Sequence, residues 1–306
     1  MTNDGNYIFD RALLTRRRLR AHHSGGEVDF LYRHAGEDML DRLSLIQRQF
    51  PVVLNLGGGR AVLSPHLRRL AGTTDVIEAD AAAGLLDEGG ACRVVADEEA
   101  LPFKTGSLDL VVSCLALQLV NDLPGALLQM RHALRPDGLL LATLLGGRTL
   151  HELRDAMLVA ESEIDGGVSP RVAPFADVRD LGALLQRAGL ALPVADSDTL
   201  EVGYATPFDL MRDLKGMGWS NMLAQRKTTL TRRATLMRAA EIYAERHARP
   251  DGRITATFEI ITLTGWAPHE SQQQPLRPGS AKARLADALG VEEKPADSKG
   301  DGSEGG

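Results

Sequence analysis

Short apolar segments alternate with amphipathic segments through the first half of this 306-residue chain. The apolar segments are rich in aliphatic residues and too short for helices, so they predict strands. The predicted strands are 52–56, 75–79, 92–96, 108–113 and 138–144. Helical spacing occurs between them, as at 122–135, and over 26–49 before the first strand. This alternation is typical of an α/β fold, in which helices cover both faces of a parallel sheet.

The pattern changes after residue 146, where helical spacing dominates and predicts a helical cap within about 147–250. The segment that ends at Tyr204 offers a sixth strand, and the β-rich residues 255–266 offer a late one. The predicted helices of this region are 147–162, 176–188, 206–217 and 230–248.

The predicted domain organisation has three parts. They are an N-terminal arm over 1–25, a main domain over 26–266 and a C-terminal extension over 267–306. The extension turns to Gln, Pro, Gly and charged residues. From residue 291 onward it lacks the apolar content to fold, which predicts disorder.

Composition excludes several classes of protein. No run of about eighteen apolar residues occurs, so we expect no transmembrane segment, while peripheral membrane contact stays compatible with the sequence. The amino terminus lacks the basic-then-apolar order of a secretory signal, which favours a cytoplasmic protein.

A basic cluster lies near the amino terminus. Its members are Arg16, Arg17, Arg18 and Arg20. Because acidic Asp4 and Asp10 precede it and the chain carries a formal charge of -6, we interpret the cluster as a solvated helix face or a patch for an acidic partner. A nucleic-acid site and a transit peptide are the disfavoured alternatives.

Two cysteines and eight histidines bear on redox and metal chemistry. Cys92 and Cys114 each lie in an apolar stretch, which predicts buried thiols in a reducing compartment. The histidines show no zinc spacing, and none begins a His-x-Asp or His-x-Glu pair. No metal site is therefore predicted.

Three consecutive glycines, Gly57, Gly58 and Gly59, directly follow the first strand. In open α/β sheets, ligands bind at the carboxyl edge of the strands, and glycines there allow a tight bend and close approach to a polar ligand. The alternative is a surface turn that needs positive φ angles. The glycines alone leave both interpretations open.

Acidic residues end the next two strands. Asp80 stands 21 positions beyond Gly59, where a carboxylate accepts the hydroxyls of a ribose, or where it caps a helix over 81–87. We place Glu78 on the opposite face, as the weaker candidate. Asp97 stands where it can accept a hydrogen bond from an adenine amino group, although acidic turns are common.

Five motifs together resemble class I S-adenosylmethionine-dependent methyltransferases. They are Leu-Asn-Leu-Gly-Gly-Gly-Arg at 54–60, Glu-Ala-Asp at 78–80, Ala-Asp-Glu-Glu-x-Leu-Pro-Phe at 96–103, Leu-Asp-Leu-Val-Val-Ser at 108–113 and Leu-Arg-Pro-Asp-Gly at 134–138. Further motifs narrow the resemblance, over roughly 7–282, to the methyltransferase-fold assembly factor of respiratory complex I. They are Ile8-Phe9-Asp10-Arg11, Gly146-Gly147-x-Thr149-Leu150, Gly166-Gly167-x-Ser169-Pro170, Asp213-Leu214-x-Gly216-Met217-Gly218 and Gly265-Trp266-x-x-His269-Glu270.

The resemblance implies a Rossmann-like, seven-stranded, mostly parallel sheet that binds S-adenosylmethionine, with Asp80 at the ribose and Asp97 near the adenine. The implied cofactor-binding residues are Asn55, Gly57, Gly58, Gly59, Asp80, Asp97, Glu98 and Ser113. It also implies a protein substrate, a complex I iron–sulfur subunit, on which the mitochondrial relative is regarded as an arginine hydroxylase. Methyltransferases that esterify a malonyl carrier protein are more distant relatives.

The chain departs from the family at several positions. Asn55 replaces an acid, Gly58 a cysteine and Ala61 a glycine, while Gln118 and Leu119 replace histidine and tryptophan. Asn55 offers no carboxylate to the sulfonium or amino group of the cofactor, so lower cofactor affinity is expected.

Three functions are compatible with these features. The first is a methyltransferase-type enzyme that modifies a protein, the second an arginine hydroxylase, and the third a non-catalytic assembly chaperone on the same fold. The strand-four sequence continues as Ser113-Cys114-Leu115 and lacks the turn that grips a flipped base, so no nucleic-acid substrate is expected. No catalytic residue is predicted, because methyl transfer depends mostly on positioning and desolvation.

Overall fold

The structure is a computed structural model. It describes residues 7–24, 28–57, 62–86 and 92–273. The chain forms one compact unit, Met1–His269, and a C-terminal unit, Glu270–Gly306, that lies almost wholly outside the described residues. The predicted disorder from 291 also lies outside them, and the predicted domain boundaries stay predictions. Within the described part of the chain, no helix is long and apolar enough to cross a membrane.

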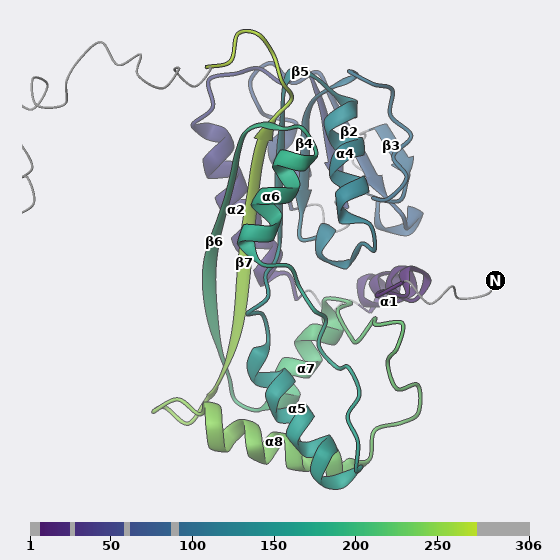
Figure 1. Ribbon diagram of the computed structural model, residues 1–306, viewed down its shortest axis with the longest axis vertical. Helices are drawn as coiled ribbons and strands as arrows, with labels where there is room; N and C mark the ends of the chain where they lie inside the picture. Colours follow the sequence, from purple (N-terminus) through teal and green to yellow (C-terminus); the bar gives the residue numbers. More distant parts are fainter. Residues whose placement is uncertain (1–6, 25–27, 58–61, 87–91, 274–306) are drawn as a thin grey trace, which may run out of the picture. The chain divides into compact units, whose positions relative to one another are not determined.

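Seven strands form one sheet in the order β3-β2-β1-β4-β5-β7-β6 (Figure 1). The strands are β1 (Val52–Leu56), β2 (Asp75–Asp80), β3 (Cys92–Val95), β4 (Leu108–Cys114), β5 (Leu134–Leu145), β6 (Ala191–Tyr204) and β7 (Ile254–Trp266). The first five are parallel, and β7 runs antiparallel to both β5 and β6. The predicted α/β class with a mostly parallel seven-stranded sheet is confirmed.

Helices cover both faces of this sheet. The helices described are α1 (Arg11–His23), α2 (Phe30–Ser44), α3 (Ser64–Leu67), α4 (Leu123–Ala133), α5 (His151–Ile164), α6 (Val178–Arg187), α7 (Pro207–Gly216) and α8 (Arg233–His247), with short 3-10 helices η1 (Ala83–Leu85) and η2 (Leu117–Leu119). The apolar sides of α2 and α3 share one core with the sheet, and those of α4 and α6 share another on the opposite face.

Polar side chains fix where several helices begin. Asp10 accepts from the backbone N–H of Leu13 at 2.9 Å at the start of α1. Asp122 accepts from the N–H of Gly125 at 2.8 Å at the start of α4. Such caps satisfy N–H groups that have no partner within the helix, which stabilises a helix by about 1 kcal/mol.

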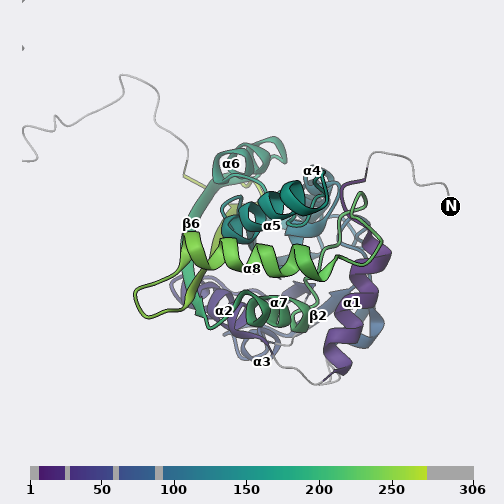
Figure 2. The same cartoon turned by 90° about the horizontal axis from the view of Figure 1, so that it is seen from below.

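The helices α5, α7 and α8 pack together beyond the carboxyl ends of the parallel strands (Figures 1 and 2). They form the cap that the sequence predicts for this region. The helix α6 falls within the same predicted range but packs on the sheet beside α4. Its Leu181 and Leu185, one turn apart, are fully buried against the sheet, and this apolar stripe explains its position.

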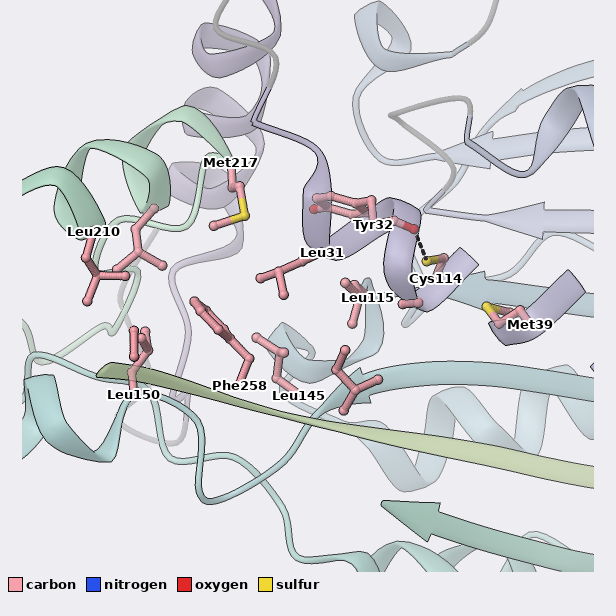
Figure 3. Packing of buried hydrophobic residues seen from close by; sticks show 14 of the residues in the cluster. Leu31, Tyr32, Met39, Cys114, Leu115, Leu145, Leu150, Leu210, Met217 and Phe258 are labelled. Atoms are coloured by element: carbon pink, nitrogen blue, oxygen red, sulfur yellow. Dashed lines mark hydrogen bonds between the residues drawn. The ribbon is translucent and has the colours of Figure 1, made fainter. Parts of the chain in front are cut away.

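A buried cluster connects the sheet to α2 and the cap (Figure 3). Leu31 of α2 and Phe258 of β7 lie between the sheet and the α7 residue Leu210. Cys114 at the end of β4 donates through its thiol to the carbonyl of Tyr32, with 3.8 Å between sulfur and oxygen. Burial raises the pKa of the Cys114 thiol to about 12.

The prediction of two buried cysteines is wrong for Cys92. Cys114 is buried as expected, but the Cys92 side chain is exposed. It begins β3, an edge strand whose four residues are exposed or half-buried. An edge strand contacts a neighbouring strand on one side only, and an apolar sequence does not reveal which strand takes that place.

Candidate functional site

Asp80 lies at the carboxyl end of β2 and its side chain is fully buried. Its carboxylate accepts from the backbone N–H of Ala82 at 2.9 Å. It also accepts twice from the guanidinium of Arg18, with distances of 2.6 Å to Oδ2 and 3.3 Å to Oδ1. Of the predicted helix over 81–87, the described residues 81–86 form only the short η1, and Asp80 does not cap it. Asp80 instead ends the strand and pairs with an arginine.

Asp97 and Glu98 follow β3 and form a second acidic group. Arg11 Nη2 bonds both carboxylates, with 2.8 Å to Asp97 Oδ1, and Arg11 Nη1 donates to the carbonyl of Leu119 at 3.2 Å. The Glu98 side chain is 1% exposed. Asp97 also accepts from the N–H of Glu99 at 2.9 Å, so the acidic-turn interpretation holds as well.

The expectation of a solvated basic helix face or a patch for a partner is therefore wrong for Arg18. Arg16 and Arg20 are exposed as expected, but the Arg18 side chain is 15% exposed and pairs with Asp80. Burial opposes the charge of the Arg18 guanidinium, but Asp80 outweighs it, and the pKa of Arg18 lies above its ordinary value. The spacing of Arg11 and Arg18 could have indicated that these two arginines act together. They stand seven residues apart and so share one face of a helix.

Asn55 on β1 is 1% exposed and lies in a buried polar group. Its Nδ2 donates to Glu78 Oε2 at 2.8 Å and to Ser64 Oγ at 3.2 Å. Its Oδ1 has no hydrogen-bond partner among the described residues. Glu78 is paired in register with Asn55, and it lies two residues before Asp80, so both acids share a face of the sheet. The sequence-based assignment of Glu78 to the opposite face is thus wrong.

Glu78 therefore places a buried carboxylate beside the position where the family carries an acid and this chain carries Asn55. Sequence reasoning ranked Glu78 as the weaker candidate because it compared acids along one strand rather than across two. The pairing of β1 with β2 decides the neighbour.

Gly57 directly follows β1 and has a φ angle of 72°, so the positive-φ interpretation holds. A Cβ atom built on Gly57 would lie 2.3 Å from Cβ of Ala116, so Gly57 lies close to the side chain of Ala116. Gly58 and Gly59 lie outside the described residues. Ser113 on β4 is fully buried on the face opposite Asn55, because its neighbour Val112 pairs with Asn55.

A cavity of about 240 Å³ lies between the sheet and the cap. Its lining is mostly apolar and comes from Phe9, β5, η2, α5, α7, α8 and the loops around 171–175 and 219–222. Leu119 lines this cavity and also accepts from Arg11, which places the cavity next to Asp97 and Glu98. Gln118 lines it too, so two positions at which the chain departs from the family lie at this wall.

Polar groups in the cavity wall are few. Gln118 Nε2 donates to the carbonyl of Leu115 at 2.8 Å, and its Oε1 has no hydrogen-bond partner among the described residues. Arg171 pairs with buried Glu161. Within the described part of the chain, no group of three His, Cys, Asp or Glu side chains is arranged to hold a metal ion.

Comparison with known proteins identifies the fold and the family. Residues 54–142 match the family described as "Methyltransferase domain". The chain is 38% identical to the mitochondrial arginine-hydroxylase NDUFAF5 of Danio rerio, over 94% of this chain and 91% of that protein. It therefore belongs to the methyltransferase-fold family that includes these arginine hydroxylases.

Other members of the family carry different names. The human arginine-hydroxylase NDUFAF5 is 41% identical, over 90% of this chain and 81% of that protein. A malonyl-[acyl-carrier protein] O-methyltransferase of Methylovorus is 34% identical, over 88% of this chain and 92% of that protein. Among solved structures, the YcgJ protein of Bacillus subtilis superposes with a TM-score of 0.52 at 13% identity, covering 77% of this chain and 99% of that one, which shows the shared fold.

Proposed function

We propose that this protein is an S-adenosylmethionine-dependent enzyme that modifies a protein side chain during assembly of respiratory complex I. One observation carries the proposal. Three carboxylates, those of Asp80, Asp97 and Glu98, lie at the carboxyl edge of the parallel sheet. Arg11, which bonds Asp97 and Glu98, also donates to the carbonyl of Leu119 in the wall of an apolar cavity. The acids suit the adenosyl part of the cofactor, and the cavity suits the group to be modified.

The described residues fit the cofactor by their chemistry. Asp80 can accept hydrogen bonds from both ribose hydroxyls, and Asp97 with Glu98 can accept from an adenine amino group. Glu78 restores a carboxylate near Asn55. When bound, the cofactor supplies an electrophilic methyl group. The apolar wall of the cavity excludes water from an incoming side chain, and positioning then provides most of the rate enhancement.

Hydroxylation of an arginine of a complex I iron–sulfur subunit is the second candidate. It is favoured by 38% and 41% identity to relatives named arginine hydroxylases, each over at least nine-tenths of this chain. The reaction replaces one C–H bond by C–OH and is a two-electron oxidation. It therefore needs dioxygen and a two-electron reductant, neither of which an amino-acid side chain supplies.

A non-catalytic assembly chaperone is the third candidate. The pairing of Arg18 with Asp80 favours it, because a carboxylate that only stabilises the fold needs no ligand. The first candidate takes precedence because the acids and the cavity lie together at the edge where α/β sheets bind ligands.

Mass spectrometry of the complex I iron–sulfur subunit separates the three. A strain that lacks this protein is complemented with the wild type, with Asp80→Asn, and with Asp75→Asn, an exposed acid on the same strand that serves as the control. We expect a methyl-sized increment with the wild type and Asp75→Asn, and its loss with Asp80→Asn. Loss of a single oxygen in the deletion strain would instead support hydroxylation. Restored complex I assembly by a folded Asp80→Asn protein, with no mass change in any strain, would support the chaperone.

A further inference from the structure

Two arginines of the helix α1 attach it to acids at the sheet edge. Only Leu14 and Ala21 of its thirteen residues are buried. Arg11 and Arg18 extend from one face of α1, and each pairs with acids that the proposed function assigns to the cofactor. Charge-assisted contacts therefore add to the packing of Leu14 and Ala21 in holding α1.

Arg18 occupies the side of Asp80 that a ribose would need. Two of the roughly four lone-pair positions of the Asp80 carboxylate accept from Arg18, and a third accepts from the N–H of Ala82. One position remains for two ribose hydroxyls. Binding of an adenosyl group through Asp80 therefore requires the Arg18 guanidinium to leave.

Arg11 occupies the second acidic group in the same way. Its guanidinium bridges Asp97 and Glu98, and Glu98 is 1% exposed. An adenine amino group seeking the same carboxylate oxygens would compete with Arg11. Both acidic groups are thus paired by arginines of a single helix.

The residues just before α1 are held firmly and can act as a pivot. The N–H of Asp10 donates to the carbonyl of Met222 at 2.9 Å, and the N–H of Ala224 donates to the carbonyl of Ile8 at 2.8 Å. The N–H of Phe9 donates to Asn121 Oδ1 at 2.8 Å. The backbone before α1 is therefore fixed by a short ladder, while the helix itself relies on its side chains.

We propose that α1 is a gate on the cofactor site: Arg18 and Arg11 pair with Asp80, Asp97 and Glu98 in the free protein, and the cofactor binds by displacing them. This proposal rests on the proposed function, because it assumes that those acids bind S-adenosylmethionine. Because only the open form binds, the apparent Kd of the free protein is the intrinsic Kd divided by the open fraction. Removing the gate therefore tightens binding by the reciprocal of the fraction of time that it is open.

Titration calorimetry with S-adenosylmethionine and S-adenosylhomocysteine tests the gate. The full-length wild type is compared with Arg18→Gln and Arg11→Gln. Arg16→Gln and Arg20→Gln are matched controls that lose the same charge from exposed positions of α1. We expect Arg18→Gln to bind about five- to 150-fold more tightly than the wild type, the usual range of coupling between a ligand and a conformational change, and the controls to bind as the wild type does.

The outcomes distinguish the gate from the function on which it rests. Equal or weaker binding by Arg18→Gln, with measurable binding by the wild type, overturns the gate and leaves the proposed function standing. No binding by any variant at millimolar cofactor refutes both and supports the chaperone.

Hydrogen exchange on the wild type tests the gate without a variant, so it applies even if Arg18→Gln does not fold. S-adenosylhomocysteine should speed the exchange of amides in α1 by loosening the helix, while amides of β1 and β4 become slower or stay unchanged. Slower exchange in α1 on binding would show that the helix closes over the cofactor and would overturn the gate.

Discussion

A single methyl group added at Gly57 tests how closely the turn after β1 lies to Ala116. Its φ of 72° lies in the left-handed region, and an added Cβ would lie 2.3 Å from Cβ of Ala116. Two apolar carbons normally stay about 3.5–4.0 Å apart, so Gly57→Ala must push one of the two segments away. The N–H of Gly57 donates to the carbonyl of Ala79 at 2.8 Å, which resists that movement.

The expected cost has two parts that a control can separate. A left-handed alanine costs about 1–2 kcal/mol, and overpacking costs about 1–3 kcal/mol more. Gly106 has a φ of 64° and nothing within 4 Å of its added Cβ, so Gly106→Ala should show only the first part. The free energy of unfolding of Gly57→Ala should therefore be about 1–3 kcal/mol lower than that of Gly106→Ala. This corresponds to a Tm that is roughly 2–12 °C lower for a domain of this size.

Urea unfolding, followed by tryptophan fluorescence, measures both free energies of unfolding. Ala116→Gly in the Gly57→Ala background should recover most of the overpacking cost. The next nearest atoms to the added Cβ are then Glu98 Oε1 at 3.5 Å and Ala116 Cα at 3.8 Å, which are ordinary contacts. Equal stability of Gly57→Ala and Gly106→Ala, or no recovery in the double variant, would refute the close approach of these two segments.

Two further predictions concern titratable groups. A thiol reagent applied to the native protein at pH 8 should label one cysteine quickly, and Cys92→Ser should abolish that labelling while Cys114→Ser preserves it, because burial raises the pKa of Cys114 to about 12. Rapid labelling of both thiols would contradict this assignment. Burial alone would raise the pKa of Glu161, but bonds from Ser169 and Arg171 outweigh burial and hold it below its ordinary value of 4.5. The lowered pKa stabilises the fold above pH 4.5, and this contribution is lost as the pH falls through the folded-state value. Urea unfolding should therefore show a large gap between the wild type and Glu161→Gln at pH 7 that narrows below pH 4.5, and a gap independent of pH would disprove the coupling.

Hydrophobic periodicity predicted the order and type of most elements because strands and helices differ in local spacing. It located β1, β2 and β4 to within one residue. It placed β5 four residues too late, since the Pro136-Asp137-Gly138 turn signature lies inside the strand, with Asp137 at a φ of 65°. Local turn chemistry predicts a change in the backbone, but the neighbouring strand decides whether pairing continues through it.

At the candidate site, too, local sequence predicted one part and the tertiary structure decided the other. The sequence by itself determined the glycine turn after β1 and acids at the ends of the next two strands, because motifs of this kind depend on short-range spacing. Only the tertiary structure decided what those acids contact. Arg18 and Asp80 are 62 residues apart, and Arg11 and Asp97 are 86 apart. The folded chain brings α1 across the sheet edge, and the cost of burying Asp80 and Glu98 without a partner makes those ion pairs a property of the whole fold.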